Sequence, residues 1–326
     1  MICQNVAELL EQYDSFFIDV YGVIYDGFWL FPGVKEMLKK MKDLQKKVII
    51  VSNSPLISEE AMAIYEKFGL EHGVHYDEVV TSGQAFLMKF RDKIKNATCF
   101  SWVFDRNDML FSNLDLKETQ SLDEADFIYV GKLTINKESF SVDNLKTKSG
   151  QEILLEELVT TDYHEIVGFE KFAEILDKCL ELKRPFVVIN PDIFAIEKVN
   201  DKKRPILCQG GIGEFYERAG GEVLYFGKPY QTIFDFAKNF IKNCSKTAMI
   251  GDTPWTDILG GNMANLDTIL VLKGVSASFL GEITDQNISE KIDKLITEIS
   301  LKMTHKSFLN QSMRPTHIAK NFAENL

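Results

Sequence analysis

Several side chains that suit phosphoryl transfer occur where the sequence predicts that strands end. They are Asp19, Ser52, Lys228, Asp252 and Asp257. A carboxylate can attack phosphorus and form an aspartyl-phosphate, and a hydroxyl and an ammonium group can hold the phosphoryl oxygens and stabilise the transition state. A magnesium ion, which prefers carboxylate oxygens, would screen the attacking carboxylate from the phosphate dianion. The set therefore indicates a magnesium-assisted phosphoryl-transfer site.

Apolar segments of strand length alternate with helical patterns around these residues. In the first half, residues 16–18 and 48–51 are apolar and end just before Asp19 and Ser52, and a helical pattern follows each segment. A continuous apolar segment is typical of a strand buried on both faces. The alternation with helices predicts a doubly wound parallel sheet of the α/β class. Ligands of such sheets bind beyond the carboxyl ends of the strands, where both side chains are expected.

The same alternation returns late in the chain, with strand-like segments at 223–226, 248–250 and 268–272. The long stretch between the two halves has an alternation of its own and is too long to be a loop. We therefore expect a discontinuous core, an inserted α/β cap domain and a polar, mildly basic tail. Their predicted bounds are 1–100 and 222–300 for the core, 101–221 for the cap and 301–326 for the tail.

Four segments resemble, in order, the four motifs of haloacid dehalogenase (HAD) superfamily hydrolases. They read FFIDVYGVIYDG, VIIVSNSP, GKP and MIGDTPWTDI. A large insertion follows the second motif, a layout that resembles subfamily IIA, which includes nitrophenyl-, pyridoxal- and phosphoglycolate-phosphatases and NagD-type nucleotidases. Each motif is weak alone, whereas four in order with the insertion in this place are specific. The resemblance covers about residues 12–300 and implies a HAD-like Rossmannoid core with an inserted cap.

The resemblance also implies a set of ligands for Mg²⁺. Asp19 would be both the nucleophile and a metal ligand, and the main-chain carbonyl of Tyr21 would be a second ligand. Asp252 would bind the ion directly, and Asp257 would support it from further out or through water. Taken singly, an Asp at a strand end is often the N-cap of the next helix, and Asp257 could equally cap or pair with the helix that follows. The order of the motifs favours the metal site.

The phosphate ligands follow from the same resemblance. Ser52 and Lys228 would bind the phosphoryl group, with Asn53 beside them. Asp192 would face the substrate from the cap, although Asn190-Pro191-Asp192 is first of all a turn pattern. The histidines are scattered, and we expect His164 to be structural rather than catalytic.

The first motif departs from the family pattern at its third residue. HAD phosphatases normally read Asp-x-Asp, and the second Asp protonates the leaving group and then activates water, whereas this chain reads Asp19-Val20-Tyr21. A phenol has a reference pKa near ~10, so ionising it at pH 7 costs about 4 kcal/mol. A neutral phenol can donate a hydrogen bond but is a poor general base. Tyr21 is therefore counted among the candidate catalytic residues with an altered role.

Three interpretations follow from Tyr21. The first is a phosphatase that is slow on ordinary esters, acts on good leaving groups or uses another acid, for which Asp26 is the nearest candidate. The second is a metal-independent dehalogenase, because haloacid dehalogenases read Asp-x-Tyr-Gly and a halide needs no proton. The late cap and the pair Asp252 and Asp257 disfavour it. The third is a protein that binds a phosphorylated ligand without turnover.

Composition limits the class of partner. The 326 residues suit two domains or one large domain. The formal net charge of -11, with no dense Lys/Arg cluster, disfavours nucleic-acid binding. The five cysteines are dispersed and form no CxxC pattern, which argues against a zinc site and a disulfide framework.

The remaining expectations concern location and assembly. The N-terminus has no basic and apolar regions of a signal peptide, and no apolar segment approaches the ~20 residues that span a bilayer. We expect a cytoplasmic enzyme that acts on a small phosphorylated metabolite, with a homodimer as one outcome.

Overall fold

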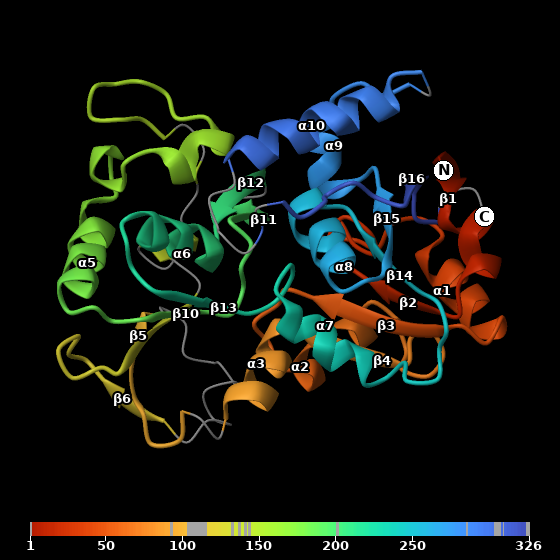
Figure 1. The fold of residues 1–326 in the computed structure, drawn as a ribbon, viewed down its shortest axis with the longest axis horizontal. Helices are drawn as coiled ribbons and strands as arrows, with labels where there is room; N and C mark the ends of the chain where they lie inside the picture. Colours follow the sequence, from red (N-terminus) through yellow and green to blue (C-terminus); the bar gives the residue numbers. More distant parts are fainter. Residues whose placement is uncertain are drawn as a thin grey trace. The chain divides into compact units, whose positions relative to one another are not determined.

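The computed structural model describes residues 2–91, 94–102, 116–131, 134–135, 138–139, 142, 145–199, 202–284, 286–302, 308 and 310–323. It divides into two compact units. The first comprises Met1–Ser52, Ile57–Thr81 and Gly227–Leu326, and the second comprises Asn53–Leu56 and Ser82–Phe226. Each unit is described by itself below (Figure 1).

The first unit is built on a parallel sheet, which has seven strands among the described residues. Its order is β1 (Ile2–Asn5), β16 (His317–Asn321), β15 (Asp267–Val271), β14 (Thr247–Gly251), β2 (Ser15–Ile18), β3 (Lys47–Ser52) and β4 (Glu78–Thr81). Every neighbouring pair is parallel. The central strands are almost wholly buried, as expected for a sheet covered on both faces. The predicted α/β class with a parallel sheet is confirmed.

Helices accompany the strands of this unit. They are α1 (Val34–Asp43), α2 (Ser58–Lys67), α7 (Gln231–Lys238), α8 (Leu259–Met263), α9 (Gly274–Leu280) and α10 (Ile288–Lys302), with short helical turns η1 (Val6–Gln12) and η4 (Pro254–Ile258). Alternate residues of a strand point to opposite faces of the sheet. In β15, Ile269 lies in one core cluster, whereas Leu270 packs with Ile292 of α10 in another, so both faces of the strand are covered. The sheet is therefore doubly wound.

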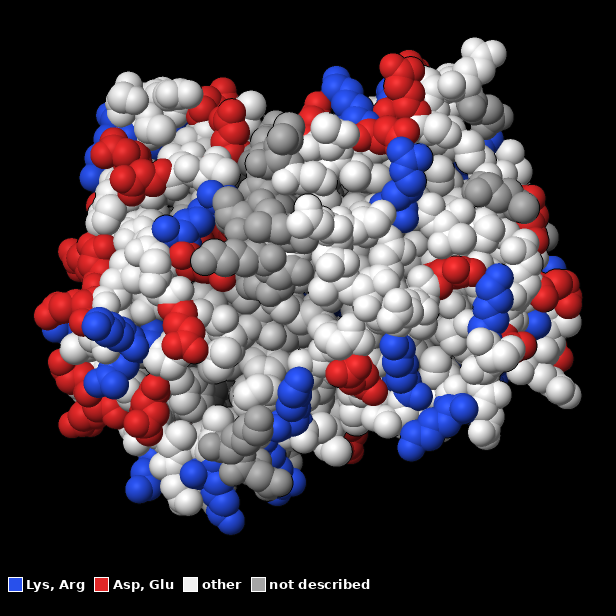
Figure 2. Space-filling model, in the orientation of Figure 1, with Lys and Arg blue, Asp and Glu red and all other residues white. Residues whose placement is uncertain are grey.

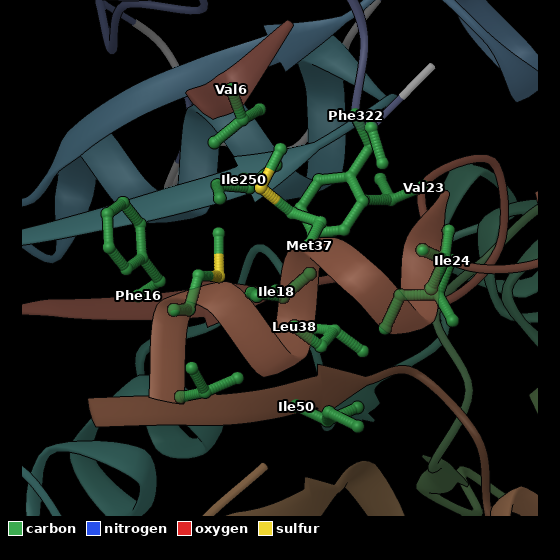
Figure 3. Close-up of a cluster of buried hydrophobic side chains, with 14 of the residues drawn as sticks. Val6, Phe16, Ile18, Val23, Ile24, Met37, Leu38, Ile50, Ile250 and Phe322 are labelled. Atoms are coloured by element: carbon green, nitrogen blue, oxygen red, sulfur yellow. The ribbon is translucent and has the colours of Figure 1, made fainter. Parts of the chain in front are cut away.

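The larger of these clusters lies between the sheet and α1. Phe16, Ile18 and Ile50 of the strands meet Met37 and Leu38 of the helix, and all five side chains are fully buried (Figure 3). Removing the area of such side chains from water supplies the main favourable free energy of folding, at roughly 25 cal/mol per Å². This packing fixes the strand ends on which the polar residues sit.

The C-terminal segment belongs to the same core. Residues 317–321 form β16, which lies between β1 and β15, so the segment predicted to be a tail contributes a strand to the sheet. Leu272 N donates a hydrogen bond to Ala319 O over 2.9 Å, and Phe322 is 2% exposed. Residues 303–307, 309 and 324–326 of the predicted tail lie outside the described residues.

The second unit has its own parallel sheet, with five strands in the part that the structure describes. Its order is β13 (Val223–Tyr225), β10 (Phe186–Val188), β7 (Phe127–Val130), β5 (Thr98–Trp102) and β6 (Lys117–Thr119). The helices and helical turns are α3 (Ser82–Phe90), α5 (Glu170–Glu181), α6 (Gln209–Arg218), η2 (Leu155–Thr160) and η3 (Tyr163–Glu165). Two hairpins complete it, β8 (Thr134–Ile135) with β9 (Glu138–Ser139), and β11 (Phe194–Val199) with β12 (Lys202–Leu207). The expected inserted α/β layer is thus a compact unit.

The bounds of the second unit differ from those expected at 101–221. Residues 223–225, predicted as a core strand, instead pair with β10 of the second sheet. The unit also includes α3, because the rings of Phe86 and Phe90 pack against Phe226 with centroids 4.8 and 4.7 Å apart. Aromatic packing across segments distant in the sequence sets these bounds, and composition does not reveal it.

The surface carries charges of both signs. On the face drawn in Figure 2, Lys and Arg side chains are interspersed with Asp and Glu side chains. Within the described residues, the structure contains no helix with both the length and the apolar character needed to cross a bilayer.

Phe322→Ala should lower the free energy of unfolding by about 3–5 kcal/mol, because it leaves a cavity in the core beside α1. Gln311→Ala, an exposed position in the same C-terminal segment, should change it by less than about 0.5 kcal/mol. Urea unfolding followed by circular dichroism measures both. Equal, small effects would contradict the placement of this segment in the core.

Candidate active site

The candidate residues of the first unit lie at the carboxyl edge of its sheet, at the point where the strand order reverses. From β2 the chain continues through β3 and β4 on one side, and β14 and β15 lie on the other. Asp19 follows β2 and Asp252 follows β14, and Asp19 N donates a hydrogen bond to Ile250 O over 2.9 Å. Where the chain continues to opposite sides from two adjacent parallel strands, a crevice for a ligand opens beyond the carboxyl ends of those strands.

An ammonium group joins two carboxylates at this edge. Lys228 Nζ forms ion pairs with Asp19 Oδ1 and with Asp257 Oδ1, the second over 2.7 Å. Lys228 is 2% exposed, Asp19 8% and Asp257 1%. Buried charges persist when they are paired in this way, because removing one partner leaves an uncompensated charge away from water. The structure therefore brings together Asp19, Lys228 and Asp257, as the sequence predicted.

A third carboxylate completes the cluster. Asp19, Asp252 and Asp257 each offer one ligand oxygen, and these oxygens lie within 4.8 Å of one another in the described part of the chain. Burial, with the charges of Asp19 and Asp257, raises the pKa of Asp252 well above its usual range. Burial, with the charge of Asp257 and against the attraction of Lys228, raises the pKa of Asp19 to about 7. The excess of negative charge, carried on oxygen donors, suits a divalent cation.

Lys228 stays charged in this environment. Burial alone would lower the pKa of its ammonium group, but the charges of Asp19 and Asp257 outweigh burial and raise it above the usual value. The side chain can therefore serve as a fixed positive charge toward an anionic group. Electrostatic stabilisation by a charge held in place before the reaction is strong in a site from which water is excluded.

Neighbouring backbone and hydroxyl groups hold the two motif-four carboxylates in place. Asp252 Oδ1 accepts a hydrogen bond from Thr253 Oγ1 over 2.9 Å, and its Oδ2 accepts one from Val275 N over 2.6 Å. Asp257 Oδ2 accepts from Thr253 N over 3.1 Å. Gly22 has a φ of +78°, and a Cβ there would lie 2.1 Å from Asp252 Oδ2. Glycine is thus required by space as well as by conformation.

Ser52 has a buried partner that the sequence did not reveal. It ends β3, and a hydrogen bond joins its side chain to the phenol of Tyr65 in α2. Burial, followed by the charge of Asp19, raises the pKa of Tyr65, so the phenol stays neutral. Tyr65 lies outside the four motifs. The sequence signal that could have found it is a phenol hydroxyl at a helical position that faces the core.

Tyr21 and Asp26 lie in the loop that follows Asp19. Tyr21 is 51% exposed, and its ring meets that of Tyr25 edge-on with centroids 5.2 Å apart. Asp26 Oδ1 accepts hydrogen bonds from the main-chain N of Phe28 and of Trp29, each over 2.8 Å. Asp26 therefore shapes a turn, which weakens its candidacy as a replacement acid. A metal contact through the carbonyl of Tyr21 stays a prediction.

The other two predicted phosphate ligands belong to the second unit. Asn53 Nδ2 donates to Asp192 Oδ1 over 2.9 Å, and Asn53 Oδ1 accepts from Ser82 Oγ over 3.5 Å. Asp192 N also donates to Asn190 Oδ1 over 3.0 Å, which is the turn that the sequence indicated. Substrate roles for Asn53 and Asp192 stay predictions.

His164 also lies in the second unit. Its Nε2 is 3.2 Å from Asp177 Oδ1, and both side chains are about half exposed. This surface pair fits the structural role expected for it.

The parallel sheet with buried carboxylates at its switch point defines a Rossmannoid α/β protein whose site suits a divalent cation. A family model described as haloacid dehalogenase-like hydrolase matches residues 16–117, and a second, described as HAD-hydrolase-like, matches residues 225–295. The chain belongs to the haloacid dehalogenase-like hydrolases. The first match extends into the second unit, and the two matches together include the residues of the carboxylate cluster.

Named relatives and solved structures agree with this family. Phosphoglycolate phosphatase 1A of Arabidopsis thaliana is 24% identical over 298 residues, covering 87% of this chain and 75% of that protein. Chronophin of Mus musculus is 22% identical over 281 residues, covering 83% and 85%. The fold matches a haloacid dehalogenase-like hydrolase of Brucella suis 1330, with a TM-score of 0.70 and 23% identity over 98% of this chain and 99% of that one. It also matches a p-nitrophenyl phosphatase from Archaeoglobus fulgidus, with a TM-score of 0.61, 24% identity and coverage of 95% and 96%.

Mg²⁺ should raise the melting temperature of the chain by about 4 °C at a hundredfold excess over its dissociation constant, because binding relieves repulsion in the carboxylate cluster. Asp252→Asn should abolish most of the rise. Asp43→Asn, which alters an exposed pair with Lys39, should keep it. Differential scanning fluorimetry measures all three, and an equal rise in Asp252→Asn would contradict the site.

Tyr65→Phe should weaken binding of inorganic phosphate about fivefold, since Ser52 loses the partner that orients its hydroxyl, a loss of about 1 kcal/mol. The matched control is Tyr76→Phe. The Tyr76 hydroxyl is buried in the same unit and has no hydrogen-bond partner among the described residues. Isothermal titration with Mg²⁺ present compares them. Equal affinities in the two variants would remove Tyr65 from the site.

Proposed function

We propose that the chain is a Mg²⁺-dependent phosphatase that acts on a small phosphorylated metabolite through an aspartyl-phosphate on Asp19. The observation that carries this proposal is the buried ion pair of Asp19 with Lys228 inside a cluster of three carboxylates at a strand end. A nucleophile, a fixed cation and metal-ligand oxygens occur there together. Phosphoryl transfer needs those three elements.

Each of these side chains would have its own role in the reaction. Asp19 Oδ attacks phosphorus, and the ammonium of Lys228 and the hydroxyl of Ser52 bind phosphoryl oxygens as charge moves onto the leaving group. Water then attacks the phosphorus of the aspartyl-phosphate and restores the carboxylate. The carboxylates of Asp19, Asp252 and Asp257 would hold the divalent ion, which screens negative charge on the phosphate. Tyr65 would keep Ser52 in position.

The names of the relatives support the substrate class. Phosphoglycolate phosphatase is named for a small phosphorylated compound, and the p-nitrophenyl phosphatase for a small aryl phosphate. In the sequence, the main segment of the second unit lies between strand β4 and the motif that contains Lys228, as expected for an inserted cap domain. Nothing in the comparisons favours the dehalogenase interpretation. Cytoplasmic location and a homodimer stay predictions.

Asp19→Asn should reduce the rate of 4-nitrophenyl phosphate hydrolysis by about 10³-fold or more, because an amide cannot form the acyl-phosphate. The control is Asp43→Asn at an exposed carboxylate, which should keep the wild-type rate. Released nitrophenolate is followed with and without Mg²⁺. Near-wild-type activity in Asp19→Asn would refute the proposed nucleophile. A folded, Mg²⁺-loaded wild type that binds but never hydrolyses phosphate esters would replace the phosphatase by a phospho-ligand-binding protein.

A further inference from the structure

The carboxyl groups beside Asp19 already form hydrogen bonds or ion pairs with other groups within the described residues. Both oxygens of Asp252 accept hydrogen bonds, from Thr253 Oγ1 and Val275 N. One oxygen of Asp257 faces Lys228 and the other accepts from Thr253 N. All four of these carboxyl oxygens therefore already have a partner within the described residues.

A phenol faces solvent two residues after the nucleophile in the sequence. Tyr21, two residues after Asp19, is half exposed. The next carboxyl along the loop, Asp26, is bound to two main-chain N–H groups of its own turn. Phenols are weak acids, with a reference pKa near ~10, so they protonate a leaving oxygen less readily than a carboxylic acid does.

We propose that this enzyme cleaves phosphoryl groups carried on weakly basic oxygens, as in acyl phosphates and phosphoanhydrides, in preference to alkyl phosphate esters. The inference rests on the proposed phosphatase function and specifies its substrate class. It sets this chain apart from a relative named for phosphoglycolate, which is an alkyl phosphate.

The chemistry balances without an added acid. Asp19 Oδ forms a bond to phosphorus while the bond from phosphorus to the leaving oxygen breaks, and its electron pair departs with a carboxylate or a phosphate. Such an anion is stable at neutral pH and needs no proton. Water then bonds to phosphorus, the bond to Asp19 breaks and the Asp19 carboxylate returns. The protons of the water remain on the inorganic phosphate or pass to solvent.

An alkoxide leaving group behaves differently. Its conjugate acid is far weaker than a carboxylic acid, so the bond to phosphorus breaks slowly unless a proton arrives in the transition state. Positioned general acids contribute typically about 10²–10⁴-fold to such steps. Alkyl esters should therefore lose a factor of this order here, whereas acyl phosphates and phosphoanhydrides should lose little.

The experiment measures kcat/KM with Mg²⁺ for acetyl phosphate, pyrophosphate, 4-nitrophenyl phosphate, phenyl phosphate and glycerol 2-phosphate. The wild type should lose about 10³-fold or more between the weakly basic leaving groups and glycerol 2-phosphate. Tyr21→Asp should regain about 10²-fold on glycerol 2-phosphate and change little on acetyl phosphate. Tyr21→Phe, which keeps the ring and removes the hydroxyl, tests whether the phenol itself donates the proton. The control is Asp43→Asn at an exposed carboxylate, which should follow the wild type across the series.

Three results would overturn the inference. A wild-type series with no dependence on leaving-group basicity would do so while leaving the phosphatase function intact. A selective loss on glycerol 2-phosphate in Tyr21→Phe would show instead that the phenol acts as the acid. Absence of turnover of every compound would remove the proposed function as well. A preference for acetyl phosphate over pyrophosphate would assign acyl phosphates, and the reverse would assign phosphoanhydrides.

Discussion

Three buried carboxylates gathered around one buried ammonium group determine the character of this protein's site. Burial, together with the repulsion of like charges at such short range, raises the pKa values of Asp19 and Asp252. Lys228 offsets one unit of that charge. The remainder makes the site a strong attractor for a divalent cation, and the bound cation would in turn allow a phosphate dianion to approach a carboxylate nucleophile.

The fold holds these charged groups in place and stabilises them. Parallel strands β2 and β14 deliver Asp19 and Asp252 to the same edge, and the apolar side chains below them are packed between sheet and helices. Main-chain N–H groups and the hydroxyl of Thr253 bind the outer carboxylate oxygens. Gly22 leaves the space that Asp252 occupies. Rigidity of this kind keeps charged groups in place, so little reorganisation is needed during reaction.

The strand-tip carboxylates and Lys228 could be predicted because apolar segments mark buried strands and parallel strands share one carboxyl edge. Other features depend on contacts that no local pattern encodes. β16 is short and includes an interior lysine, Lys320, so its segment resembles a polar tail. The pairing of β13 with β10 decides to which unit residues 223–225 belong. The hydrogen bond of Tyr65 with Ser52 joins positions on separate elements. The turn that its carboxylate forms in the structure disfavours Asp26 as the replacement acid.

The central claim is that Asp19 becomes covalently phosphorylated. Mg²⁺-loaded enzyme can be mixed with acetyl phosphate, quenched within milliseconds and reduced with borohydride, which converts an aspartyl-phosphate to homoserine. Mass spectrometry of the peptide that contains residue 19 then identifies the modified position. The account predicts homoserine at residue 19 and nowhere else in the peptide. Release of phosphate at the normal rate with aspartate unchanged at residue 19 would contradict it.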